Sequence, residues 1–197
     1  MSSRGERRVK ISRDKLVGLV VALACLAFSA IGLRVNDPPE FTYVDGVRDQ
    51  PVSIEQSEVT VGEVGVGTRL IRNGEMQAET EGMFVIVEVT LAVPGNRRVN
   101  LNHAQLITKR RAYDGWSGAT VRAEPGFQSE EQLIFEVDPA QIDDLSLEIW
   151  AMGVVYGFYQ RARIHLGITP ENADRWRRNA VGRALTYELS GSMTALP

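Results

Sequence analysis

Residues 16–33 form an unbroken run of eighteen residues without a charged side chain, bounded by Lys15 and Arg34. As an α-helix this run would span about 27 Å, close to the hydrocarbon thickness of a bilayer. Only helices and closed barrels can cross that layer, because every backbone polar group needs a partner within the protein. The run therefore predicts one transmembrane helix.

The distribution of charge predicts the orientation of that helix. Residues 1–15 contain six Lys or Arg and two acidic residues, whereas the whole chain has a formal net charge of −3. Basic residues beside a span stay in the cytoplasm, so we expect residues 1–15 inside the cell and the acidic remainder outside. An acidic body also argues against nucleic acid as a partner, because phosphates require a basic surface.

Two other interpretations of the run stay open. The basic start, with residues 27–29 (Ala-Phe-Ser) as a cleavage site, is typical of a signal peptide, although the usual apolar core has only about 7–15 residues. Cys25 follows Ala-Leu-Ala and could carry a lipid anchor, but eight uncharged, mostly apolar residues follow it. In either case the protein would be secreted or lipid-anchored. As the only cysteine, Cys25 cannot form an intramolecular disulfide.

Small residues recur within the run at spacings of four and three, which places them on one helix face. Such a face lets two membrane helices approach closely, and van der Waals packing then drives their association. We therefore expect a helix-packing face for another membrane or envelope protein, or for a second copy of this chain. The alternative is that Gly and Ala are simply frequent in membrane helices. The residues are Gly18, Ala22, Cys25, Ser29 and Gly32.

After a proline-containing linker at 34–51, residues 52–168 show strand after strand. In 83–93 every second residue is apolar, and the same period recurs in 132–137, 145–149 and 162–168. Turn signals such as Pro94-Gly95 separate the strands. A glycine offset predicts a bulge near Gly62, and Gly65 and Gly67 have the spacing of bulge or turn glycines. The pattern predicts an all-β, antiparallel, immunoglobulin-like β-sandwich.

The periodicity changes after residue 168. Thr169 and Pro170 have the composition of a helix start, with Thr169 as the cap. Ala173, Trp176 and Ala180 share one face of the expected helix, which we place at 169–189. A polar tail follows at 190–197. The organisation is thus cytoplasmic segment, membrane helix, linker, sandwich, amphipathic helix and tail.

Two segments carry a family resemblance. Residues 81–91 (EGMFVIVEVTL) and 135–139 (FEVDP) resemble the glycine-led second strand and the late strand-and-proline signature of telokin-like, immunoglobulin-like domains of bacterial secreted proteins and lipoproteins. This resemblance covers about residues 52–168 and implies an extracytoplasmic binding or envelope role. The basic C-terminal helix and the anchor-like leader depart from that family, which supplies no catalytic residue.

No cluster of residues with the spacing of a catalytic, cofactor or metal site is evident. His103 and His165 lie in different strands, and neither has a Cys, Asp or Glu at ligand spacing. The acidic doublets Glu130-Glu131 and Asp143-Asp144 lack the spacing of a calcium loop and are expected at solvated strand ends. We therefore expect no cofactor and no metal.

An aromatic segment at 150–160 (WAMGVVYGFYQ) is the candidate partner surface. It carries no charge, and its aromatic residues either complete the sandwich core as a hairpin or form an exposed loop that binds a protein or glycan. The function that these features predict is a non-enzymatic membrane protein that presents a sandwich to envelope proteins and touches membrane lipid. An enzyme with a dispersed site is the other class. The candidate surface comprises Trp150, Tyr156, Phe158 and Tyr159.

Overall fold

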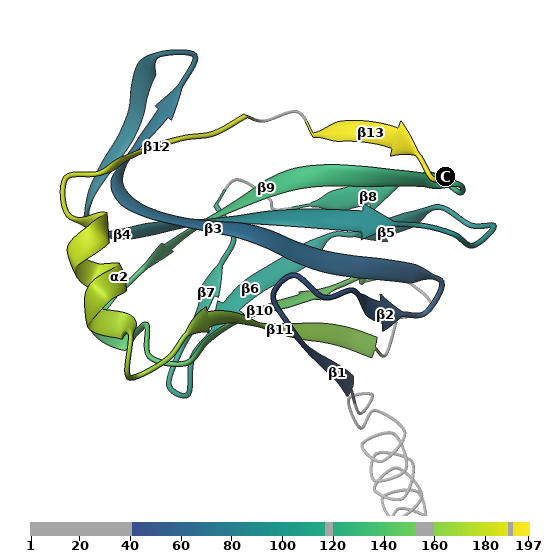
Figure 1. Cartoon of the computed structure of the whole chain (residues 1–197), viewed down its shortest axis with the longest axis horizontal. Coiled ribbons are helices and arrows are strands. Elements are labelled where there is room, and N and C mark those ends of the chain that lie inside the picture. The colour runs from purple at the N-terminus through teal and green to yellow at the C-terminus, as the bar shows by residue number, and fades with distance from the viewer. Residues whose placement is uncertain (1–40, 117–119, 153–159, 189–190) are drawn as a thin grey trace, which may run out of the picture. The chain divides into compact units, whose positions relative to one another are not determined.

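The computed structural model describes residues 41–116, 120–152, 160–188 and 191–197, which form two β-sheets packed face to face (Figure 1). One sheet has five strands in the order β1-β11-β10-β6-β7. Their bounds are Thr42–Val47, Gln160–Ile168, Leu145–Trp150, His103–Ile107 and Ala112–Asp114.

The second sheet has six strands. Its order is β12-β3-β4-β9-β13, and β2 pairs with β3 beside this path. The bounds are Ala184–Thr186, Ser57–Arg72, Glu75–Ala92, Phe127–Val137, Ser192–Ala195 and, for β2, Val52–Ile54. A separate pair, β5 (Val99–Leu101) with β8 (Val121–Ala123), lies antiparallel, and a 3-10 turn, η1, spans Pro139–Gln141.

The apolar side chains at alternate positions of the predicted strands fill the space between the two sheets. Burying these apolar side chains removes them from water, at roughly 1.5–3 kcal/mol for each large one. The predicted strands at 83–93, 132–137, 145–149 and 162–168 all contribute, so the β-sandwich prediction is confirmed. Fully buried members include Val85, Val87, Val89, Phe135, Leu147, Ile149, Ile164 and Leu166.

The predicted bulge in β3 is also present. The register of β3 against β4 shifts between Val61 and Val64, which places the irregularity at Gly62 and Glu63. A bulge inserts an extra residue into one strand and increases its local twist. The long β3–β4 hairpin ends in the turn at Asn73 and Gly74, both with positive φ.

The expectation of an entirely antiparallel sandwich is wrong at two edges. β1 lies parallel to β11, and β12 lies parallel to β3. Parallel neighbours need a long connection, and both pairs join strands that are far apart in the sequence. β1 also falls within the predicted linker 34–51, so its residues 42–47 are part of the sheet rather than a spacer.

The C-terminal helix is shorter than predicted. α2 spans Ala173–Ala180, and Gly182, with φ +68°, follows its end. Asn172 occupies the cap position in place of Thr169 and holds the preceding turn, because its Oδ1 accepts from Thr169 N at 2.9 Å. As predicted, Ala173 and Ala180 are buried and Trp176 packs against the core.

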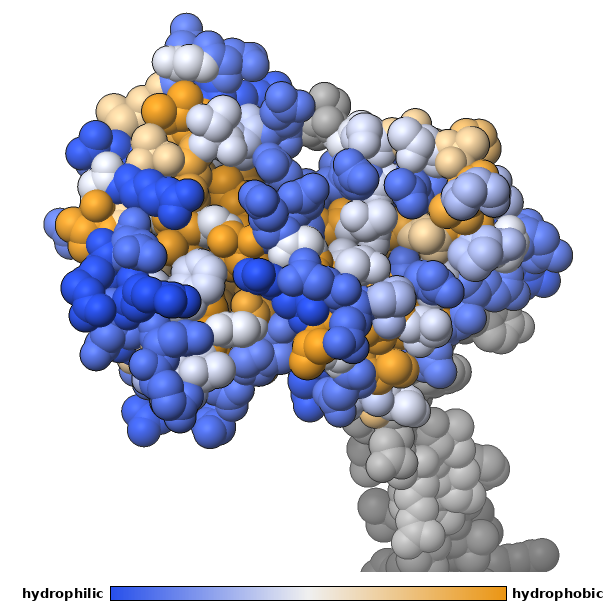
Figure 2. All heavy atoms as spheres, in the orientation of Figure 1, coloured by the Kyte–Doolittle hydropathy of each residue, from blue (hydrophilic) through white to orange (hydrophobic). Residues whose placement is uncertain are grey.

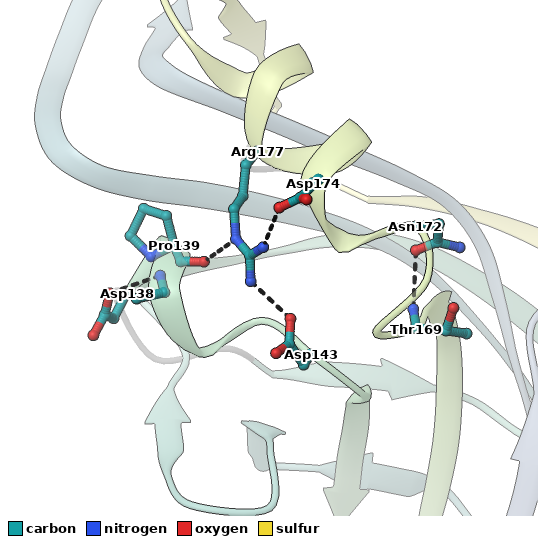
Figure 3. A network of polar contacts seen from close by, with 8 residues as sticks. Asp138, Pro139, Asp143, Thr169, Asn172, Asp174 and Arg177 are labelled. Carbon is teal, nitrogen blue, oxygen red and sulfur yellow. Dashed lines mark hydrogen bonds and ion pairs between the residues drawn. The ribbon is translucent and has the colours of Figure 1, made fainter.

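Arg177 fixes α2 to the turn that follows β9 (Figure 3). Its Nε donates to Pro139 O at 2.7 Å, while Nη2 and Nη1 reach Asp143 Oδ1 and Asp174 Oδ1 at 2.7 and 2.6 Å. Burial alone would lower the pKa of Arg177, but the hydrogen bonds and charges of the two carboxylates outweigh it and raise that pKa.

Residues predicted as the end of the helix and as a free tail instead cover the six-stranded sheet. Leu185 and Tyr187 are buried against Phe84, Ile86 and Ile134 on the side of the sheet away from the main core, together with Leu70. β13 then pairs with β9. On the face shown in Figure 2, apolar residues are visible between hydrophilic ones near β12, whereas the region where Figure 1 places α2 shows mainly hydrophilic residues.

Residues 1–40 lie outside the described part of the chain, and the predicted membrane helix with its packing face falls within them. Among the described residues, no helix has the length and apolar character needed to span a bilayer.

Candidate functional site

The outer surface of the five-stranded sheet carries charged and aromatic side chains in register. Along β11, Ala162, Ile164 and Leu166 point into the core, so Arg161, Arg163 and His165 point outward, in agreement with the alternation at 162–168. The strand register sets Glu148 of β10 and Asp45 of β1 beside Arg163, and Tyr43 beside Arg161. We call this surface the outer face; its members are Phe41, Tyr43, Asp45, His103, Glu148, Trp150, Arg161, Arg163 and His165.

One row of the outer face is a stack across four neighbouring segments. The Arg161 Cζ lies 3.6 Å from the ring centroid of Phe41 and 4.0 Å from that of Trp150. His103 stacks on Trp150, with centroids 5.3 Å apart and planes inclined by 13°. A guanidinium over an aromatic face is attracted by the ring quadrupole, by about 0.5–2 kcal/mol. The row therefore brings four planar groups into contact.

The next row is centred on a buried carboxylate. Glu148 is only 4% exposed, and its Oε1 accepts from Arg163 Nε and Nη2, both at 2.8 Å. Its Oε2 lies 3.9 Å from Arg161 Nη1. Arg163 also lies over the Tyr43 ring, 3.8 Å from the centroid. One carboxylate thus orients both arginines of the face.

The charge balance of this row keeps Arg163 protonated. Burial alone would lower its pKa, but the hydrogen bond and charge of Glu148, with smaller contributions from Tyr43 and Asp45, outweigh burial and raise the pKa. Arg163 keeps 38% of its side chain exposed, and Tyr43 is 39% exposed. Both remain available to a partner at the surface.

His165 occupies the third row with both ring nitrogens engaged. Its Nε2 lies 3.1 Å from Asp144 Oδ1, and its Nδ1 accepts from Gly167 N at 3.0 Å. Lys109 Nζ adds an ion pair of 3.5 Å to Asp144 Oδ2. A general base needs a free lone pair within reach of its substrate, which neither nitrogen offers here. His103 lies in a different row, so the two histidines are not brought together.

Trp150 differs from both sequence interpretations of the aromatic segment. It is 5% exposed, so it is not a free surface aromatic, yet it packs on the outer face between Arg161 and His103 rather than in the sandwich core. Tyr156, Phe158 and Tyr159 lie outside the described residues, as do Gly18, Ala22, Cys25, Ser29 and Gly32.

The acidic doublets take part in separate local contacts. Asp143 binds Arg177, and Asp144 binds His165. Glu130 accepts from Ser192 Oγ at 3.3 Å. Burial raises the pKa of Glu131, against the opposing effects of the Gly191 N–H and the Arg122 charge. Within the described ranges, no three His, Cys, Asp or Glu side chains converge as a metal site.

Phe41 and Tyr43 are two members of the outer face that sequence reasoning missed. Both lie in the predicted linker, where prolines and aspartates obscured a short alternation. The available signal was the six-residue stretch Thr42–Val47, in which Val44 and Gly46 alternate with Tyr43, Asp45 and Val47. Val44 packs against the core and Tyr43 lies on the outer side.

Comparison with known proteins identifies no family. No family model matches the chain, and no curated protein matches it. An uncharacterised β-sandwich protein from Clostridium difficile 630 aligns over 64% of this chain and 95% of its own, with 8% identity and a TM-score of 0.42. The yjhA protein from Bacillus subtilis aligns over 77% and 99%, with 10% identity and a TM-score of 0.40.

A third structure, the ycdA lipoprotein candidate from Bacillus subtilis, aligns over 65% of this chain and 41% of its own, with 13% identity and a TM-score of 0.44. At these identities and scores, we draw no conclusion about function from the three similarities.

Proposed function

We propose that this protein is a non-enzymatic, single-pass membrane protein whose β-sandwich lies outside the cytoplasm and binds a protein partner through its outer face. The observation that carries the binding role is the exposed pair of Tyr43 and Arg163, which lies beside the stack of Phe41, Arg161, Trp150 and His103. Trp, Tyr and Arg are the residues that supply most of the binding energy in protein interfaces.

Preorganisation supports this choice of surface. Contacts with Glu148 and the aromatic rings already hold the two guanidinium groups in place. Less side-chain entropy is therefore lost when a partner binds here. That loss is about 0.5–1.5 kcal/mol for each long side chain that binding immobilises. The partner that fits has an acidic or carbonyl-rich surface opposite Arg163 and an apolar side chain opposite Tyr43.

The topology rests on the sequence of residues 1–34. Eighteen uncharged residues between Lys15 and Arg34 are long enough to cross a bilayer, and the preceding basic residues favour a cytoplasmic start. We further propose that the sandwich belongs with the telokin-like, immunoglobulin-like extracytoplasmic domains that its strand motifs resemble. Association through Gly18, Ala22, Cys25, Ser29 and Gly32, with an envelope protein or a second copy, would complete the assembly.

Crosslinking in native membranes tests the binding role. A photoreactive amino acid placed at Tyr43 of the full chain should capture a partner, because this residue is exposed within the outer face. The same group at Met76, 62% exposed on the β3–β4 hairpin, is the matched control. Capture from Met76 but not from Tyr43 would overturn the assignment of the outer face.

The alternative is a secreted or lipid-anchored binding protein with a cleaved signal peptide, which the residues before Cys25 and residues 27–29 favour. Intact-mass determination of the mature chain separates the two forms. A mass that includes residues 1–34 supports the anchored form, and loss of the first 24 to 29 residues supports the alternative.

A further inference from the structure

A cavity of about 100 Å³ lies at the end of the sandwich where β10 ends and β11 begins. Among the described residues its apolar wall consists of Ile54, Val99, Leu101 and Ala151, each no more than 6% exposed. Asn102 fixes this wall, because its side chain donates to Met152 O and accepts from Met152 N. An engineered apolar cavity of about 150 Å³ holds benzene, so this one suits a branched group of about four carbons.

The charged residues that line the same cavity, Glu55, Arg97 and Arg98, are exposed and carry both signs of charge. Arg98 is committed to an ion pair with Glu124. Arg97 also lines the cavity but makes no ion pair or hydrogen bond with any described residue. Its charge is therefore not neutralised by any described residue.

Glu55, which is also exposed, is the acidic residue in the lining of the same cavity. Its backbone N–H donates to Gln160 Oε1 at 2.8 Å, and its φ of 53° fixes the turn in a conformation that few side chains adopt. Burial raises the pKa of the Glu55 carboxyl group, and no cationic neighbour opposes this rise. Glu55 and Arg97 therefore line one cavity with opposite charges that are not paired with each other.

We infer that this cavity binds a small zwitterion with an aliphatic side chain, of the class of the branched aliphatic α-amino acids. The side chain fills the apolar wall, Arg97 binds the carboxylate, and Glu55 binds the ammonium group. A pocket with an apolar interior and a few convergent polar groups is the usual form of a small-ligand site. This site lies apart from the outer face and does not depend on the function proposed for it.

Isothermal titration of the full chain in lipid nanodiscs tests the inference, with empty nanodiscs as the blank. L-leucine should bind, and glycine, 4-methylpentanoate and isopentylamine should each bind about tenfold more weakly, because each lacks one of the three recognised groups. Equal affinity for glycine and L-leucine, or no L-leucine binding at millimolar concentration, would overturn the inference.

Variants that remove one charge test which residue binds the carboxylate of the ligand and which binds its ammonium group. Arg97→Gln should weaken binding of L-leucine about tenfold and leave isopentylamine unchanged, whereas Glu55→Gln should weaken L-leucine and spare 4-methylpentanoate. Arg175→Gln is the matched control, because that exposed arginine lies on α2 and outside the cavity lining. Both test residues are exposed, so folding should be unaffected. An L-leucine affinity unchanged in both variants would overturn the assignment.

Discussion

Gly67 of β3 lies directly against Leu185 of β12: a Cβ added at Gly67 would come within 2.8 Å of Leu185 Cγ and 2.6 Å of Arg183 O. Arg183 O also accepts hydrogen bonds from Thr68 N and Arg69 N, at 3.0 and 3.2 Å. The missing side chain therefore allows the C-terminal segment to pair with β3 and to place Leu185 over Phe84 and Ile86. A glycine in a strand interior often marks such a close backbone approach.

The first prediction follows from this contact. Gly67→Ala should destabilise the sandwich by about 1–3 kcal/mol, because overpacking displaces backbone as well as side chains. Thermal unfolding measures the loss, and hydrogen exchange at 184–187 should rise. Gly62→Ala is the control, since its added Cβ would meet Glu88 side-chain atoms at an ordinary 3.8 Å. Equal effects of the two variants would contradict the clearance role of Gly67.

The second prediction concerns the buried carboxylate of the outer face. Glu148→Gln should lower stability by about 1.5–3 kcal/mol, because it removes a charge-assisted bond to Arg163 and leaves Arg161, only 14% exposed, without an anionic neighbour. Chemical denaturation measures this. Glu79→Gln breaks the exposed pair with Arg69 and should cost less than about 1 kcal/mol. Similar losses in both variants would show that Glu148 has no special role.

The core strands could be predicted from the sequence because each carries its own signal. The alternation of apolar and polar residues at 83–93 and 162–168 indicates which face of each strand is buried. The glycine offset at Gly62 predicts the bulge. β1 and β12 could not be predicted, since each is a short edge strand that gains its stability from a neighbour more than a hundred residues away in the chain. Gly65 and Gly67 were predicted as bulge or turn glycines, and the register does shift between Gly67 and Arg69. The docking of Leu185 against both glycines could not be predicted, because Leu185 lies far away in the sequence.

The outer face was predicted only in part for the same reason. Alternation in β11 indicated that Arg161, Arg163 and His165 point outward, but their partners come from three other strands. Trp150 was selected for its aromatic character, yet its burial depends on Arg161 and His103, which no local pattern connects to it.

The third prediction tests the attachment of α2. Arg177→Met should destabilise the domain by about 1.5–3 kcal/mol, because the change removes bonds to Pro139 O and to two carboxylates. Arg178→Met, at an exposed position on the same helix, should change stability by less than about 0.5 kcal/mol. Thermal unfolding of the two variants side by side provides the measurement, and equal melting temperatures would refute the anchoring role.

The last prediction concerns pH. Burial raises the pKa of Glu131 in the folded state above its unfolded value, partly opposed by the Gly191 N–H and Arg122. The folded protein then holds this proton more tightly than the unfolded chain. The contribution of this proton to the stability of the folded state is therefore complete at a pH below the pKa of Glu131 in the unfolded chain. It is lost as the pH rises through the pKa of Glu131 in the folded protein.

Glu131→Gln should accordingly raise the melting temperature at pH 7 more than at pH 4, because glutamine keeps an acceptor for the Gly191 N–H without an ionising group. Three further carboxylates, Glu88, Glu130 and Glu188, line the same groove. Glu130→Gln, at an exposed position, should show a smaller difference between the two pH values. A Glu131→Gln variant whose melting temperature shifts equally at pH 4 and pH 7 would show that this carboxyl group does not contribute to the pH dependence of stability.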